Sequence, residues 1–304
     1  MTDVHAAATH ISAGAALPEG GAPVRRASGP VLGTGLVVGA MVCQEFGAAV
    51  ATSLFPRAGA LGIVALRLVV SAAVLLVVCR PRMRGYRRVD WALIAAFGAA
   101  LAGMNTLFYQ AIDRLPLGAA VTLEVLGPLV LSVVTVRRAA GWLWAAAALV
   151  GVALLGRGGF DRLDGVGVGF ALGAGALWAA YILLSARAGS RFPRTDGLAL
   201  AMCAAAVLSL PAGVADAGSR LLNPVTLGLG AAVAVLSSVL PYTCELLALR
   251  RLAPGVFAVL MSLAPAVAAL AGYLVLDQTL TGTDIGAIAL VVAASAGAVH
   301  ASTR

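Results

Sequence analysis

The sequence predicts an all-α membrane protein of ten transmembrane helices, and three observations carry that prediction. Hydrophobic residues make up 61% of the 304-residue chain, the mean hydropathy is +0.98 and only 11% of residues are charged, against about 25% in an average soluble domain. The apolar residues gather in ten stretches, each about long enough to cross a bilayer as a helix. Those stretches hold few ionisable side chains, namely Glu45, Arg67, Glu124 and Glu245. A water-exposed globular domain is therefore excluded.

Each span is placed by its run of apolar residues, and several spans are joined by loops of only four to eight residues. Such short loops force antiparallel neighbours and are typical of a compact helical bundle. The expected spans are 31–52, 61–79, 91–112, 116–135, 141–157, 166–186, 197–215, 225–249, 253–275 and 284–302. Residues 1–30 lack the apolar core of a cleavable signal peptide, so we expect a disordered cytoplasmic tail there.

The distribution of arginine predicts the orientation in the membrane. All 21 basic residues are arginine. With a cytoplasmic N-terminus, fifteen arginines fall in cytoplasmic segments, five fall in outer loops and Arg67 lies within a span. Short cytoplasmic loops are enriched in Lys and Arg, so both termini are expected in the cytoplasm. The expected location is the plasma (inner) membrane of a bacterium.

The chain contains an internal repeat. A shift of 137 residues aligns Ala111–Val130 with Ala248–Val267 and makes eight of the twenty positions identical. The shift carries the fourth span onto the ninth, and the loops before these spans lie on opposite sides of the membrane in the expected topology. We therefore expect two inverted repeats of five spans each, 31–157 and 158–304, an architecture that recurs among secondary transporters.

Composition and motifs exclude several other functions. The net charge of +8 is spread over short loops rather than gathered on one face, which argues against nucleic-acid binding. The four cysteines have no metal-site spacing, and the three histidines lie near the ends of the chain. A GxGxxG spacing within 165–175 lies in a membrane span with no preceding strand, and no Walker-type phosphate loop occurs. We expect no metal, no cofactor and no enzymatic activity.

Four segments resemble the EamA-type branch of the drug/metabolite transporter superfamily. They are SLFPRAGALGIVALRL (53–68), GMNTLFYQAIDRLPLGAAVTLEVLGPL (103–129), LGAGALWAAYILLSARAG (172–189) and LPYTCELLALRRLAPGVFAVLMSLAPAVAAL (240–270). Within that branch they are most similar to inner-membrane threonine and homoserine exporters. The resemblance covers nearly the whole chain outside the N-terminal tail. It implies ten helices in two inverted repeats, a central cavity, and efflux coupled to proton entry.

Glu124 and Arg67 are the first candidates for a binding site. Glu124 lies eight residues into the fourth span and Arg67 six residues into the second, both from the outer side, so both lie at about 10 Å depth. A charge at membrane depth is rarely kept unless it faces a polar interior. The two residues either form a buried structural ion pair or line a cavity. There, arginine would bind a substrate carboxylate, and glutamate would take an amino group or a proton.

Glu245 and Glu45 are further candidates. Glu245 lies close to the cytoplasmic end of the eighth span. It either pairs with Arg250 or Arg251 or forms an inward-side site for a proton or an amine. Glu45 lies near the middle of the first span, the costliest depth for a charge. The resemblance implies a neutral polar residue at that position, so Glu45 is a departure that could change substrate preference or coupling.

Neutral polar and aromatic side chains in the third, sixth and eighth spans are candidates to complete the cavity. They are Asn105, Tyr109, Trp178, Tyr181 and Tyr242. The pairs in the third and sixth spans are four and three residues apart, so each pair shares a helix face, although helix packing explains them as well. Pro128 and Pro265 hold equivalent repeat positions and loosen the local helix, either as hinges or as static kinks.

We predict a secondary-active exporter of small amino acids, threonine or homoserine, that works by proton antiport and alternating access. A carboxyl group in a low-dielectric site suits proton exchange because burial favours its neutral form. The alternatives are export of another metabolite or drug, a passive channel and a membrane scaffold that transports nothing. The expected partners are the amino acid, protons and the lipid bilayer, with a homodimer left open.

Overall fold

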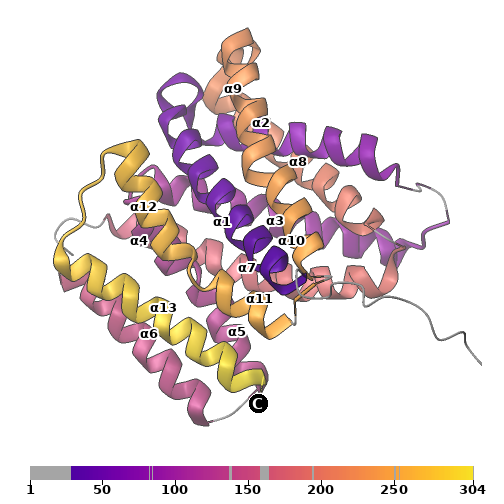
Figure 1. The fold of residues 1–304 in the computed structure, drawn as a ribbon. Helices are drawn as coiled ribbons and strands as arrows, with labels where there is room; N and C mark the ends of the chain where they lie inside the picture. The colour runs from indigo at the N-terminus through magenta and orange to yellow at the C-terminus, as the bar shows by residue number, and fades with distance from the viewer. Residues whose placement is uncertain are drawn as a thin grey trace, which may run out of the picture.

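The computed structural model is a bundle of helices that follows the expected spans closely (Figure 1). It describes residues 29–81, 83, 85–136, 139–157, 164–193, 195–249, 251–252 and 254–303, so nearly all of the tail expected over 1–30 lies outside the described residues. The helices are α1 (Gly29–Ser53), α2 (Phe55–Cys79), α3 (Arg88–Ile112), α4 (Leu117–Glu124), α5 (Leu126–Val136), α6 (Ala139–Arg157), α7 (Gly165–Arg191), α8 (Asp196–Ala217), η2 (Gly218–Leu222), α9 (Pro224–Ala234), η3 (Val235–Val239), α10 (Leu240–Leu249), α11 (Pro254–Met261), α12 (Ala264–Leu276) and α13 (Gly282–Thr303). The described part of the chain has no strand.

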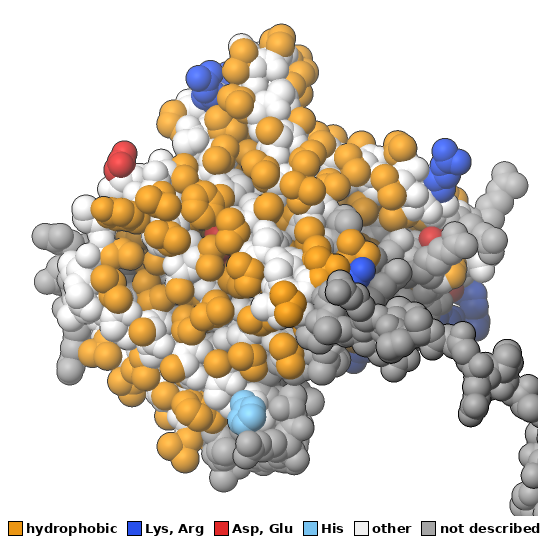
Figure 2. Space-filling view, in the orientation of Figure 1, with side chains coloured by type: hydrophobic (Ala, Val, Ile, Leu, Met, Phe, Trp, Pro, Cys, Tyr) orange, Lys and Arg blue, Asp and Glu red, His pale blue; other side chains and the backbone are white. Residues whose placement is uncertain are grey.

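The predicted all-α class with ten apolar helical segments is confirmed. Six helices are long and apolar enough to cross a membrane, and four shorter apolar helices occur at Leu117–Leu131, Trp142–Leu154, Pro224–Val239 and Gly282–Gly297. Apolar side chains dominate the face shown in Figure 2, where few charged groups appear. Extended exposed apolar surface of this kind marks a membrane or protein contact, so the exterior suits lipid.

The fourth span is broken into α4 and α5, and the ninth into α11 and α12. The first break lies at Val125 and the second at Ser262 and Leu263, and α4 and α11 are both eight residues long. Pro128 and Pro265 each stand three residues after the first residue of the break. Proline has no N–H, so the carbonyl four residues before it loses its helical donor. The two prolines therefore account for the two interruptions.

The eighth span also departs from a regular α-helix. Between α9 and α10, η3 is a turn of π-helix in which the Leu240 N–H bonds the Val235 carbonyl, five residues back. Pro241 follows directly, and because it cannot donate, the Ser237 carbonyl has no α-helical partner. Such π-bulges occur frequently at functional sites.

Glycine allows α7 to approach the first break closely. A Cβ on Gly175 would meet the backbone carbonyl oxygen of Glu124, and a Cβ on Gly127 would meet the carbonyl oxygen of Gly175. A side chain at either position would force the helices apart. The backbone of α7 therefore packs directly against the end of α4.

Ion pairs join α3 and α7 near both ends of these antiparallel helices. Arg191 Nε lies 2.6 Å from Asp90 Oδ1, and Arg114 Nη1 lies 3.0 Å from Asp164 Oδ2. Asp164 also caps α7 by accepting a hydrogen bond from the Val166 N–H. The Arg114 guanidinium and this N–H together hold the pKa of Asp164 below its usual range.

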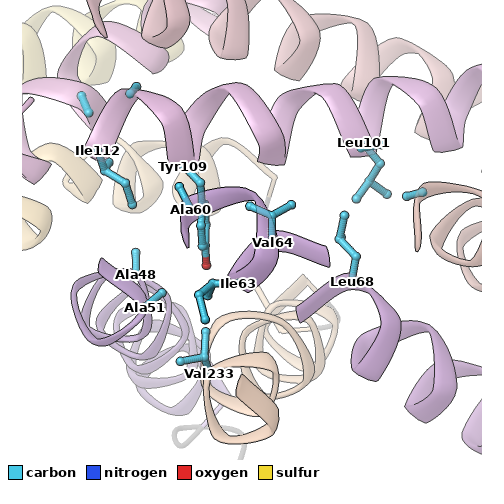
Figure 3. Close-up of a cluster of buried hydrophobic side chains, with 14 of the residues drawn as sticks. Ala48, Ala51, Ala60, Ile63, Val64, Leu68, Leu101, Tyr109, Ile112 and Val233 are labelled. Atoms are coloured by element: carbon cyan, nitrogen blue, oxygen red, sulfur yellow. The ribbon is translucent and has the colours of Figure 1, made fainter. Parts of the chain in front are cut away.

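The largest apolar core runs through the bundle and includes the end where α1 and α3 end and α2 begins. Figure 3 shows side chains from these helices and from α9 converging there. We call this the apolar cluster, defined by Ala48, Ala51, Ala60, Ile63, Tyr109, Ile112 and Val233, which are all at most 5% exposed.

Candidate functional site

A cavity of about 370 Å³ lies inside the bundle, lined by residues from both halves of the chain. This volume is in the range of small-molecule sites and corresponds to roughly twelve water molecules at about 30 Å³ each. An amino acid of the size of threonine fits with room for some water. Ala48 belongs to the lining and also to the apolar cluster, so the cluster borders the cavity.

Arg67 is the positive group of the cavity, and two helices hold its guanidinium. Its Nη1 donates to the Tyr109 hydroxyl (3.0 Å), its Nε to Ser238 Oγ (3.2 Å) and its Nη2 to the Ser237 carbonyl (3.2 Å). The guanidinium carbon also lies 5.5 Å from the centre of the Tyr109 ring, within cation–π range. The last hydrogen bond depends on Pro241, which leaves the Ser237 carbonyl without a helical donor. These contacts fix the orientation of the Arg67 guanidinium.

Three carboxyl groups line the same cavity as this guanidinium. Glu45 in α1 is 3% exposed and Glu124, the last residue of α4, is 9% exposed. Both interact electrostatically with Arg67 and with each other. Glu245 in α10 lines the same cavity. The described lining therefore carries three carboxyl groups and one guanidinium.

Most of the side chains predicted to form a site do line this cavity. They are Glu45, Arg67, Asn105, Glu124, Pro128, Trp178, Tyr181 and Glu245. Asn105 also donates from Nδ2 to the Leu101 carbonyl (2.8 Å). Pro265 is buried but is not among the lining residues.

Tyr109 departs from its expected place. It shares a helix face with Asn105, but it lies farther along α3, inside the apolar cluster, and is fully buried. Its hydroxyl accepts from Arg67 instead of facing the cavity. The side chain of Tyr242 lies outside the described residues.

The alternative in which Glu245 pairs with Arg250 or Arg251 is not seen among the described residues. Arg250 lies outside the described residues. Arg251 is exposed and donates from Nη1 to the Leu247 carbonyl (2.8 Å). Glu245 itself lines the cavity, so the structure places it with the other acids.

Sequence reasoning missed the serines of the second half. Ser237, Ser262 and Ser295 line the cavity, and Ser238 holds Arg67. Serine is common in membrane helices as a packing residue, so nothing in its spacing marks it as part of a site. One signal was present, because Pro241 stands four residues after Ser237 and predicts a free carbonyl there.

No group of three His, Cys, Asp or Glu is arranged to hold a metal within the part of the chain that the structure describes. What the cavity does offer is charge of both signs inside an apolar bundle. Broken helices, an interior charged cavity and an apolar exterior define a multi-pass membrane transporter. Comparison with known proteins specifies the class further.

Residues 165–299 match the sequence model of the EamA-like transporter family. The threonine/homoserine exporter RhtA of Salmonella typhimurium (strain LT2) is 41% identical over 261 residues, which cover 85% of this chain and 88% of that protein. RhtA of Escherichia coli K12 is 40% identical over the same coverage. A solved crystal structure covers 90% of this chain and 96% of its own, with a TM-score of 0.56 at 21% identity, which supports the fold. This chain belongs to the EamA-like transporter family.

Proposed function

We propose that this protein exports small amino acids, threonine and homoserine, across the bacterial inner membrane by proton antiport and alternating access. The names of the two relatives support the cargo. The observation that carries the proposal is the buried guanidinium of Arg67, held by neutral groups in a cavity that also contains Glu45 and Glu124. An amino-acid zwitterion needs one partner of each sign, and this cavity supplies both.

Arg67 is the carboxylate partner in this proposal. A guanidinium has five N–H donors in a planar fork and binds carboxylates through two parallel hydrogen bonds. Glu124 or Glu45 takes the ammonium group. Because such a site is shielded from bulk water, these interactions are stronger than they would be at a surface.

The excess of acid supports coupling to protons. A zwitterion has no net charge, so its binding does not change the net charge of the cavity. The described lining residues include three carboxyl groups and only one arginine. Unpaired buried charge is costly, so a carboxyl group released by the cargo takes up a proton. The inward-facing protein releases a proton and accepts cargo, and the outward-facing protein releases cargo and takes a proton.

The architecture that we propose is two inverted repeats, 31–157 and 158–304. The equal lengths of α4 and α11 support it, as do the breaks that follow them at positions related by the 137-residue shift. Helix packing also supports it, because α3 packs on α7 as α10 packs on α1, while α2–α8 and α6–α13 pair across the two halves (Figure 1). Pro128 and Pro265 are then hinges at equivalent places.

The orientation that we propose puts both termini in the cytoplasm, as the arginine distribution indicates. In that orientation the apolar cluster lies at the outer end of the cavity, while Glu245 in α10 and Phe257 in α11 line it toward the cytoplasmic end. The structure then corresponds to an inward-facing state. The apolar exterior would contact lipid, and a homodimer is compatible with it.

The test is uptake of labelled threonine into inside-out membrane vesicles, with and without an imposed acidic interior. We expect accumulation that depends on the gradient and is competed by homoserine. Uptake that only equilibrates would overturn proton coupling and indicate a passive channel or a uniporter. No uptake would overturn the cargo, and other metabolites and drugs would be tested next in the same vesicles.

A further inference from the structure

Two serine hydroxyls in the cavity wall have no hydrogen-bond partner among the described residues. They belong to Ser237 in η3 and Ser295 in α13, which are 2% and 5% exposed. Buried hydroxyls in proteins are nearly always hydrogen-bonded, so each exception needs an explanation. A ligand that brings its own polar group is one explanation, and the cavity is where a ligand binds.

Other serines in the bundle do have a hydrogen-bond partner for their hydroxyl. Ser262 lines the same cavity, and its hydroxyl donates to the Val259 carbonyl three residues back at 2.6 Å. Ser209 in α8 bonds the Ala206 carbonyl in the same way at 3.0 Å. Serines in helices commonly satisfy themselves through such backbone hydrogen bonds. Ser237 and Ser295 line the cavity and do not.

The position of Ser237 connects its hydroxyl to the rest of the site. Its carbonyl accepts from Arg67 Nη2 at 3.2 Å, so the hydroxyl of the same residue lies beside the carboxylate partner of the cargo. The hydroxyl also lies against Gly47 of α1, where a Cβ would collide with it. Ser237 therefore contacts Arg67 and packs against α1, and it lines the cavity that Glu45 also lines.

We propose that Ser237 and Ser295 bind the side-chain hydroxyl of the cargo and so restrict transport to hydroxy amino acids. This inference rests on the proposed function and adds the feature by which cargo is selected. Threonine carries its hydroxyl on Cβ and homoserine on Cγ, so two hydroxyls in different parts of the wall account for acceptance of both. A site built to hydrogen-bond a hydroxyl rejects the analogue that lacks it, because its own polar groups then stay unpaired.

The probe is 2-aminobutyrate, which is the amino acid that remains when the hydroxyl is removed from either threonine or homoserine. In vesicles with the wild-type protein, we expect threonine and homoserine to compete with labelled threonine at least roughly tenfold better than 2-aminobutyrate does. In Ser237→Ala and Ser295→Ala, that preference falls toward one for the hydroxy amino acid that the missing hydroxyl bound. The binding of 2-aminobutyrate stays the same or improves.

Ser71→Ala is the matched control. Ser71 in α2 is 1% exposed and also has an unpartnered hydroxyl, but it does not line the cavity. Its removal should leave the preference for hydroxy amino acids unchanged. All three substitutions remove an unpaired buried group, so none should lower the melting temperature of the purified protein.

The melting temperature of purified protein is a second readout, for use where a variant inserts poorly into vesicles. Ligand binding raises the melting temperature in proportion to affinity, so purified protein is titrated with homoserine, threonine and 2-aminobutyrate. Loss of the difference between these ligands in the cavity variants, but not in Ser71→Ala, supports the inference. An unchanged difference in both cavity variants overturns it while threonine export stands. A wild-type protein that takes up neither hydroxy amino acid overturns the proposed function, and the inference with it.

Discussion

The two halves of the chain share a helix break before a proline and differ in the side chains that they place around it. In both, an eight-residue helix ends at a break three residues before a proline. At the equivalent position before the break stands Glu124 in the first half and Met261 in the second, and both line the cavity. The first half supplies Arg67 and two of the three carboxyl groups, whereas the second supplies Glu245 and the lining serines. The prolines thus determine where each helix is broken, whereas the side chain that precedes the break differs between the two halves.

The largest effect should come from the acid at the first break. We expect Glu124→Gln to abolish gradient-driven accumulation of threonine, because glutamine keeps the shape but cannot release a proton. Met261→Gln, at the equivalent position of the second half, should keep gradient dependence. The measurement is uptake with and without the gradient, normalised to protein in the membrane. Equal behaviour of the two variants would remove the proposed difference between the halves.

Arg67→Lys should lower the initial rate of threonine uptake by roughly 100-fold, since hydrogen bonds to charged groups contribute about 1.5–3 kcal/mol each and lysine cannot form the fork. Arg57→Lys is the control, because Arg57 is exposed in the first turn of the same helix. A rate for Arg67→Lys within twofold of the control would show that the guanidinium does not bind the cargo.

Pro241→Ala tests whether the Ser237 carbonyl of the second half positions the Arg67 guanidinium of the first half. Alanine restores an N–H that can bond the Ser237 carbonyl, which then competes with Arg67 Nη2. We expect uptake to fall about tenfold, as for the loss of one hydrogen bond to a charged group, without a lower melting temperature. Pro211→Ala, in the interior of α8 and exposed, should leave uptake unchanged. Equal uptake in both variants would mean that Arg67 needs no such support.

The smallest effect is expected at the exposed pair between Arg114 and Asp164. Arg114 lowers the pKa of Asp164 in the folded protein, so the pair contributes stability above the unfolded carboxyl pKa and loses it as pH falls through the folded value. Asp164→Asn should therefore melt slightly below wild type at neutral pH and level with it in acid. Threonine uptake should not change. A difference that grows in acid would contradict this sign.

The spans could be predicted from the sequence because a run of apolar residues is a local signal that needs no partner. The interruptions were only partly predictable: Pro128 and Pro265 mark them, but the π-helix at Val235–Val239 depends on packing. Tyr109 shows a second limit, since spacing gives the face of a helix and not the depth at which that face stops lining the cavity. The contacts of Arg67 join residues about 170 positions apart, which no local pattern encodes.

The paired ion pairs of α3 and α7 have a mechanical consequence. One tie sits near each end of two antiparallel helices, so sliding by one residue, about 1.5 Å, would stretch both at once. The two ion pairs therefore oppose sliding of α3 along α7. These two helices carry Asn105, Trp178 and Tyr181. In the proposed transport cycle they would move together, and the cargo would meet the same wall of the cavity from either side of the membrane.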